Sequence, residues 1–223
     1  MPSGLKRFQK AEALHFFTFS CFRRLPLLET PGARETVEAV LKRTRARHQA
    51  RIYAYVLMPE HVHLLMNEPP SILVAQFLKA VKQITSRKLR GQREKFWQER
   101  YHDSNIRGET ARSEVIRYIH RNPVVRGLVE KPGNWAWSSF RHYETGVKGA
   151  VEIESQWTTF RRGNQLPEGV HIRVGERLRF PTRSAEDAET MECPQSMEDE
   201  STNSRLSQPP AHCKKRDERG TAD

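Results

Sequence analysis

Hydrophobic and polar positions follow two different periods along the first 145 residues. Short apolar runs rich in aromatic or β-branched residues are typical of strands, whereas apolar residues spaced three or four apart are typical of helices. These patterns predict strands over residues 13–22, 51–58 and 61–66, with a fourth strand or an extended segment over 95–101. They predict helices over 32–49, 71–90 and 110–121, followed by a short helical cover up to about residue 145.

Turn and capping residues mark the ends of these elements. Pro59 and Glu60 separate two predicted strands so closely that we expect an antiparallel hairpin. Helix ends are expected at residues that cap or break a helix. By that rule the first helix begins at Pro31 and Gly32, Ser71 is the N-cap of the second, Thr110 or Ser113 caps the third, and Pro123 ends it.

The predicted element order is strand, helix, strand, strand, helix, strand, helix. Strands interleaved with helices and containing one hairpin predict an α+β fold, a ferredoxin-like sandwich around a central antiparallel sheet. We expect one domain over residues 1–145 and a partly ordered C-terminal extension over 146–180. Residues 181–223 are polar and charged with few large apolar side chains, so they cannot offset the entropy of ordering and are expected to form a disordered tail.

Charge is distributed unevenly between these parts. The chain carries a formal net charge of +11, but residues 181–223 carry −4 and residues 1–180 carry +15. A body this basic favours a polyanionic partner, above all nucleic acid, over a merely solvated basic surface. Basic residues gather on two predicted helix faces, over 42–51 and 79–93, where they would bind phosphates.

Other sequence features narrow the class of protein. The three cysteines have neither the spacing of a disulfide framework nor that of a zinc site. No apolar run approaches the roughly 18 residues that a membrane helix needs, and the first ten residues lack the apolar stretch of a signal peptide. We therefore expect a cytoplasmic protein with no membrane partner.

Two histidines in the predicted hairpin are candidate metal ligands. Side chains alternate between the faces of a strand, so His61 and His63 would project from the same face with backbones about 7 Å apart. That spacing lets two imidazoles converge on one divalent ion. The alternative, a pair of histidines on a sheet face without a metal, is equally compatible with the spacing. Glu60 could orient one of the two rings, but we expect it to be a water-exposed turn residue.

Tyr118 and Asn122 form a second candidate constellation. They lie four residues apart in a predicted helix and therefore share one helix face. Tyrosines in helices are more often packing residues, so the pair alone does not indicate chemistry. Tyr101 and Tyr143 are rival nucleophiles, but neither has a metal-ligating residue type four positions later in a predicted helix.

Four segments together resemble the single-tyrosine HUH transposases, in particular the REP-associated tyrosine transposases of bacteria. YVLMPEHVHLLM at 55–66 resembles the HUH segment of that family, and RYIHRNPVVRGLV at 117–129 resembles its Tyr-x-x-x-Asn-Pro-Val helix end. FWQERYHDSNIR at 96–107 resembles the Trp-Gln segment between them, and NWAWSSF at 134–140 resembles the Trp-x-x-Ser-Ser segment that follows. The resemblance covers about residues 10–145, and it is specific because the four segments occur in the same order.

The resemblance implies a function and a set of roles. Residues 1–145 would be an HUH endonuclease domain in which His61, His63 and Asn122 bind Mg²⁺ or Mn²⁺ and Tyr118 is the nucleophile. The enzyme would cut single-stranded DNA through a 5′-phosphotyrosine intermediate and rejoin it. Its partner would be hairpin-forming single-stranded DNA from a palindromic repeat, in the bacterial cytoplasm at the nucleoid. The protein would act as a monomer or a homodimer.

Two other functions remain open from the residues alone. A ferredoxin-like module with a basic face could bind nucleic acid without catalysis, although a pure binding protein would not need His61, His63, Tyr118 and Asn122 together. A metal-dependent hydrolase would use the same metal ligands with water in place of the tyrosine.

Overall fold

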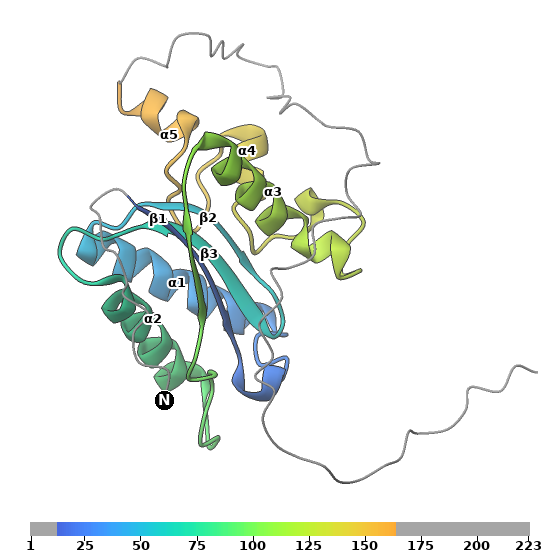
Figure 1. The fold of residues 1–223 in the computed structure, drawn as a ribbon. Coiled ribbons are helices and arrows are strands. Elements are labelled where there is room, and N and C mark those ends of the chain that lie inside the picture. The colour runs from blue at the N-terminus through green and yellow to red at the C-terminus, as the bar shows by residue number, and fades with distance from the viewer. Residues whose placement is uncertain (1–12, 164–223) are drawn as a thin grey trace, which may run out of the picture. The chain divides into compact units, whose positions relative to one another are not determined.

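Four antiparallel strands form the sheet of this protein, in the order β2-β3-β1-β4 (Figure 1). The computed structural model describes residues 13–163. The strands are β1 (Leu14–Ser20), β2 (Ile52–Leu57), β3 (His61–Asn67) and β4 (His102–Ile106). The α-helices are α1 (Pro31–His48), α2 (Val74–Leu89), α3 (Glu109–Val125), α4 (Phe140–Thr145) and α5 (Gln156–Arg161), with short 3₁₀ turns η1 (Phe22–Arg24) and η2 (Pro132–Asn134).

This arrangement confirms the predicted α+β fold with a central antiparallel sheet and the predicted hairpin of β2 and β3. The predicted extension over 146–180 contains α5, but its residues 164–180 and the tail predicted over 181–223 lie outside the described residues. The domain boundary at residue 145 therefore stays a prediction.

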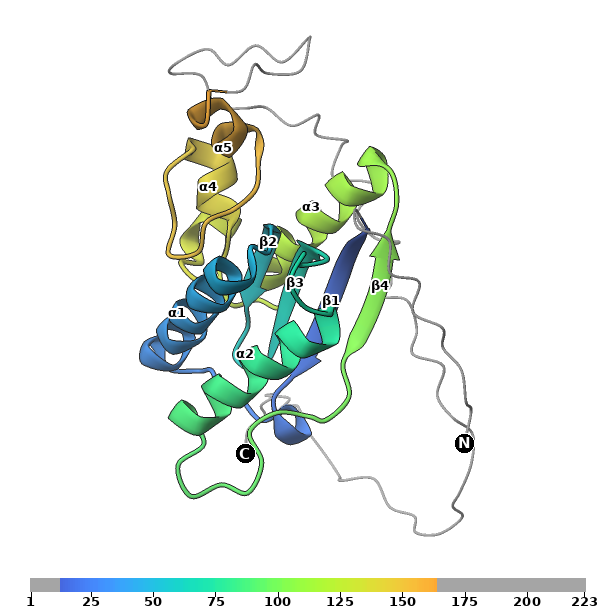
Figure 2. The ribbon, with the colours of Figure 1, turned by 90° about the vertical axis from the view of Figure 1, so that its left-hand side faces the viewer.

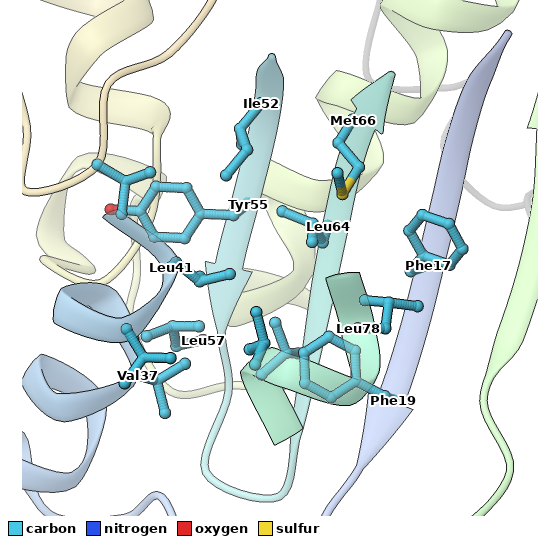
Figure 3. Packing of buried hydrophobic residues seen from close by; sticks show 14 of the residues in the cluster. Phe17, Phe19, Val37, Leu41, Ile52, Tyr55, Leu57, Leu64, Met66 and Leu78 are labelled. Carbon is cyan, nitrogen blue, oxygen red and sulfur yellow. The ribbon is translucent and has the colours of Figure 1, made fainter. Parts of the chain in front are cut away.

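The two faces of the sheet are covered by different helices. Helices α1 and α2 pack side by side on one face, and α3 crosses the other (Figures 1 and 2). Strand alternation decides which side chains meet which helix. In β3, Val62, Leu64 and Met66 join the core beneath α1 and α2, as Figure 3 shows for Leu64 and Met66. The alternate residues His61, His63 and Leu65 therefore face α3.

The segment after α3 covers the edge of β2. The backbone amide of Leu57 donates to the carbonyl of Trp137 at 2.9 Å, and that of Ser139 donates to the carbonyl of Tyr55 at 3.0 Å. The guanidinium of Arg34 in α1 lies 3.9 Å from the centre of the Trp137 ring, a cation–π contact that joins this cover to the helix layer. The helical cover expected up to residue 145 is thus present as η2 and α4.

Residues 95–101 form an extended segment, which was the predicted alternative to a fourth strand there. The fourth strand runs over His102–Ile106, and residues 95–101 contribute only an isolated bridge between Trp97 and Cys21. The reason lies in side chains from α2. The Trp97 indole donates to the Thr85 hydroxyl at 2.8 Å, and the Lys82 ammonium donates to the carbonyls of Gln98 and Glu99 at 2.6 and 3.0 Å. These bonds fix the segment against α2. Its backbone still pairs with the end of β1, because the Phe22 amide donates to the Phe96 carbonyl at 2.8 Å and the Gln98 amide donates to the Ser20 carbonyl at 2.9 Å. Regular pairing with β1 is therefore interrupted between Trp97 and His102.

Three predicted helix ends were wrong. Helix α2 begins at Val74 after an extended Leu73, and Ser71 instead donates its hydroxyl to the carbonyl of His48 at 3.4 Å. Helix α3 starts after Gly108 rather than at a Thr110 or Ser113 cap, because only glycine readily adopts the φ of 81° found there. Its last turn continues through Pro123 to Val125, since a proline so close to the end removes only one helical hydrogen bond.

Candidate active site

His61 and His63 form a buried pair on the α3 face of the sheet. Their Nε2 atoms lie 3.0 Å apart and their rings meet at 78°, with centroids 4.6 Å apart. Both residues are at most 6% exposed. The shared face that alternation predicted is therefore present, and the two rings converge on each other rather than pointing to solvent.

The outer nitrogen of each imidazole has its own partner. Nδ1 of His61 lies 3.1 Å from a carboxylate oxygen of Glu60, and Nδ1 of His63 lies 2.8 Å from the hydroxyl of Thr18. Thr18 stands opposite His63 in the pairing of β1 with β3. Because the carboxylate accepts the Nδ1 proton of His61, the lone pair of that ring is left at Nε2, directed toward His63.

The expectation for Glu60 was wrong. Its side chain is only 13% exposed, and besides His61 it accepts from the Arg126 guanidinium at 2.9 Å. Arg126 follows the end of α3, 66 residues away along the chain. Because of that separation, local turn propensity could not reveal the contact between Glu60 and Arg126. The contact of Thr18 with His63 was also missed, since the sequence placed Thr18 in a strand and gave no other signal.

Helix α3 brings Tyr118 and Asn122 to the histidine pair. The Asn122 amide nitrogen lies 3.2 Å from Nε2 of His63. One turn earlier, the Tyr118 ring meets the His63 ring nearly edge-on, with centroids 5.3 Å apart, and it contacts Phe16 of β1 in the same manner at 5.9 Å. Ile119, fully buried against the sheet, fixes the rotation of the helix that places both side chains.

Burial controls the protonation of the two histidines. It lowers the pKa of His61, and the nearby charges of Arg126 and Arg24 lower it further, against an opposing effect of Glu60. Burial and the neighbouring His61 hold the pKa of His63 well below its usual range. Both rings are therefore neutral at neutral pH, which is the form of imidazole that binds metals.

The donor atoms of this site suit a divalent ion. Two nitrogens bound to one ion at right angles, each about 2.1 Å from it, lie about 3.0 Å apart, and the Nε2 atoms of His61 and His63 are 3.0 Å apart. The Asn122 side-chain oxygen is buried and has no hydrogen-bond partner among the described residues. Rotating the amide by 180° exchanges its oxygen and nitrogen, which would direct that oxygen to the same place.

A carboxylate does not complete this donor set. Within residues 13–163, no group of three His, Cys, Asp or Glu side chains is arranged to hold a metal ion. The third donor atom available beside the histidine pair belongs to the neutral amide of Asn122, so these three side chains would add no negative charge. A bound ion would keep its full positive charge toward an anionic substrate.

Comparison with known proteins identifies the family. The family model described as "Transposase IS200 like" matches residues 12–122, from the start of β1 to Asn122. This chain belongs to the IS200-like transposase family. The match confirms the resemblance inferred from the four sequence segments, and it includes all four candidate site residues.

Individual relatives of this IS200-like transposase agree. Over 166 residues, the chain is 27% identical to the REP-associated tyrosine transposase of Escherichia coli K12, covering 74% of this chain and 98% of that protein. It is 28% identical over 140 residues to a Haemophilus influenzae protein also named as a REP-associated tyrosine transposase, covering 57% and 79%. The solved structure of a REP-associated tyrosine transposase bound to a REP hairpin shares its fold, with a TM-score of 0.57 and 22% identity, covering 69% of this chain and 92% of that one.

The rival tyrosines of this IS200-like transposase lie elsewhere. The Tyr143 hydroxyl donates to the carbonyl of Tyr53 at 2.8 Å, and burial raises the pKa of Tyr143. Tyr101 packs against Phe17 on the opposite face of the sheet. His102 and Asp103 project from opposite faces of β4. His102 stands opposite Thr18 on the α3 face, lies 2.7 Å from the Ser104 hydroxyl, and its charge helps to lower the pKa of His63. Asp103 projects from the other face and lies 2.9 Å from Nδ1 of His15. No helix of the described part is long and apolar enough to cross a membrane.

Proposed function

We propose that this IS200-like transposase is a metal-dependent HUH endonuclease that cuts and rejoins single-stranded DNA, with Tyr118 as the nucleophile. The observation that carries this proposal is the convergence of four side chains from two elements. Tyr118 and Asn122 lie one helical turn apart above the buried histidine pair, and both contact His63. A tyrosine that served packing alone would not require a buried amide and two inward-facing imidazoles beside it.

The reaction balances around the phenol oxygen of Tyr118. That oxygen attacks a backbone phosphorus and forms a phosphotyrosine ester, while the bond from phosphorus to the 3′ oxygen breaks. The phenol gives up one proton and the released 3′ oxygen takes one up. Because one phosphodiester replaces another, a 3′-hydroxyl can later attack the ester, reseal DNA and free the tyrosine without ATP.

His61, His63 and Asn122 would hold Mg²⁺ or Mn²⁺, and the two nitrogen ligands make Mn²⁺ a good fit. When bound, the ion would stabilise the negative charge that develops on the phosphate oxygens. This help is needed because a phenol with a pKa of about 10 is protonated at neutral pH and is a weak nucleophile. The remaining contribution comes from the chain. Thr18 and Glu60 orient the rings, and α3 positions the phenol against the pair.

Basic residues on the other side of the sheet would bind a different part of the DNA. Helices α1 and α2 cover the face opposite α3 (Figure 2), and their exposed side chains include Lys42, Arg43, Arg47, Lys79, Arg87 and Lys88. These residues cannot contact the phosphate held at the histidines. We propose that they bind the hairpin or flanking strand of the DNA partner through its phosphates, and that the protein acts in the cytoplasm at the nucleoid.

A trapping experiment tests the proposed reaction. The protein is incubated with labelled single-stranded hairpin DNA and Mn²⁺, then resolved on a denaturing gel. Wild type should yield a covalent protein–DNA adduct, and Tyr118→Phe should yield none while still shifting the DNA on a native gel. Tyr101→Phe is the matched control, because Tyr101 lies on the other face of the sheet, and this variant should form the adduct normally.

Other outcomes would replace the proposal. Cleavage without an adduct, equal in wild type and Tyr118→Phe, would indicate a hydrolase that uses water. A mobility shift without cleavage at any divalent ion would indicate a non-catalytic nucleic-acid-binding module. An adduct that persists in Tyr118→Phe and disappears in Tyr101→Phe would show that Tyr101 is the nucleophile. The reaction would then take place on the sheet face opposite α3.

A further inference from the structure

The turn that follows β1 has an unusual backbone. Arg23 and Arg24 are consecutive, neither is glycine, and both have a φ of 53°. Side chains with a Cβ rarely adopt this left-handed region, because the Cβ approaches the following carbonyl oxygen. Strained positions of this kind persist only where the surrounding structure holds them, and they cluster at functional sites.

Hydrogen bonds fix this turn against the β2–β3 corner that carries the histidines. The backbone amide of Cys21 donates to the carbonyl of Glu60 at 2.8 Å, and that of Leu28 donates to the carbonyl of Pro59 at 2.8 Å. Ser20, the last residue of β1, pairs directly with His61. The turn therefore begins directly after the β1 residue that pairs with His61. Its backbone is hydrogen-bonded to the same β2–β3 corner that carries the histidines.

Backbone hydrogen bonds place Arg24 next to the β2–β3 corner, because its amide donates to the carbonyl of Cys21 at 3.0 Å and the amide of Cys21 donates to the carbonyl of Glu60. The charge of Arg24 helps to lower the pKa of His61, as does that of Arg126 from the end of α3. Arg24 and Arg126 differ in whether a carboxylate neutralises their charge. Arg126 pairs with Glu60 at 2.9 Å, whereas no carboxylate in residues 13–163 lies within the 4.0 Å of an ion pair from the exposed Arg24 guanidinium.

Its neighbour Arg23 has a different environment. The Arg23 guanidinium lies over the Phe22 ring, 5.3 Å from its centre, and the Lys95 ammonium lies 5.8 Å from the same ring. The two arginines thus share a charge, a backbone conformation and an exposed position, but Arg24 rather than Arg23 is among the charges that lower the pKa of His61.

We propose that Arg24 forms a phosphate-binding subsite beside the histidine pair, which holds the phosphodiester next to the one that Tyr118 attacks. This inference rests on the proposed function and adds a residue to it. A guanidinium is suited to the role because it stays charged and can donate two parallel hydrogen bonds to one phosphate. Arg24 would be a positioning residue, since it would hold the strand in register and would take no part in bond making.

The left-handed backbone makes a sharp test possible. Glycine adopts a φ of 53° without strain, so Arg24→Gly removes the guanidinium while leaving the turn at least as stable. Arg23→Gly is the matched control, with the same loss of charge at the same φ. Both variants should unfold at or above the wild-type temperature, and Arg24→Lys keeps the charge but not the paired donors.

The readouts are adduct formation with Mn²⁺ under single turnover and binding of single-stranded DNA as salt is varied. For Arg24→Gly we expect the DNA concentration at half-maximal rate to rise about tenfold or more, with the rate at saturation changed little. Arg24→Lys should fall between this variant and wild type. The salt dependence of log affinity should weaken by about 0.7 in Arg24→Gly, the value of one phosphate contact on a single strand. Arg23→Gly should match wild type in both measurements.

The inference and the proposed function fail in different ways. If wild type forms no adduct, the proposed function fails, but the salt dependence still tests the subsite. If wild type forms the adduct and Arg24→Gly behaves like Arg23→Gly in both measurements, the subsite is overturned. A lower saturating rate with an unchanged half-maximal concentration would also overturn it, because Arg24 would then act in the chemical step.

Discussion

A carboxylate oxygen of Glu60 accepts a hydrogen bond from the neighbouring His61 ring, with 3.1 Å between the oxygen and Nδ1. The bond selects the tautomer that leaves Nε2 free toward His63, 3.0 Å away. It also ties the ring to the end of α3, because Arg126 pairs with the same oxygen at 2.9 Å. Residues that orient a metal-binding histidine in this way contribute to affinity although they do not touch the ion.

Glu60→Gln should therefore weaken metal binding. The amide keeps the shape of the side chain but loses the charge that favours a proton on Nδ1 of His61. We expect about 10- to 100-fold weaker Mn²⁺ affinity or cleavage, measured by titrating Mn²⁺ in the adduct assay. Glu114→Gln, which changes an exposed carboxylate of α3, should have no effect. Equal Mn²⁺ requirements in Glu60→Gln and wild type would show that the hydrogen bond has no role in holding the ion.

His61→Ala should separate cutting from binding. The substitution removes one of the two converging imidazoles, so we expect no detectable adduct. DNA affinity should remain within a few-fold of wild type, because it comes mainly from Lys and Arg contacts to phosphates. Adduct gels and equilibrium binding on the same preparation measure both. A folded His61→Ala protein that loses affinity and cleavage in parallel would contradict this division.

Substitutions on the outer helix layer should have the opposite effect. Lys79, Arg87 and Lys88 are exposed on α2, which covers the sheet face away from Tyr118. Their triple alanine variant should bind hairpin DNA more weakly with a smaller salt dependence, yet form adduct at the normal rate once DNA is saturating. The matched control replaces Lys131, Arg141 and Lys148, three exposed cations of the cover after α3. If both triple variants lose the same affinity, α2 has no special role in binding.

Stability should depend on pH through His120, which lies on the opposite side of α3 from the site. Its Nε2 lies 2.8 Å from the Ser139 hydroxyl, and burial lowers its pKa to about 3. An unfolded histidine has a pKa of about 6.5. As pH falls below that value, His120 binds a proton in the unfolded chain but stays neutral in the folded protein. This group's contribution to the free energy of unfolding therefore declines by up to about 1.4 kcal/mol per pH unit.

His15 should show the reverse dependence. Burial lowers its pKa, but the hydrogen bond and charge of Asp103 outweigh that effect, with Glu68 adding to them, so the net pKa is raised. Its stabilisation is complete below about pH 6.5 and disappears as pH rises through the folded value. The free energy of unfolding is measured with denaturant for wild type, His120→Gln and His15→Gln across this pH range. The difference between wild type and each variant gives the contribution of that histidine. Parallel curves for all three proteins would show that neither histidine titrates with folding.

Much of the fold, and the two residue pairs of the candidate site taken separately, could be predicted from local pattern. Strand alternation places His61 and His63 on one face, and helical spacing places Tyr118 and Asn122 on one side of α3. Both relations depend only on the geometry of a single element. The basic helix faces and the buried strands were predicted correctly for the same reason.

Errors arose where a distant side chain decided the outcome. The segment over 95–101 has strand-like residues, but Thr85 and Lys82 of α2 hold it, and it pairs with the end of β1 only at the Cys21–Trp97 bridge. Glu60 resembles an exposed turn residue until Arg126 and His61 are placed around it.

The sequence by itself thus determined which side chains each strand and helix would present together. Only the tertiary structure decided that α3 crosses the sheet above β3, so that the amide of Asn122 reaches His63 at 3.2 Å, and that Thr18 supports that ring from the neighbouring strand. The physical reason is that periodicity is a property of one segment, whereas the meeting of segments depends on how all the buried surfaces pack at once.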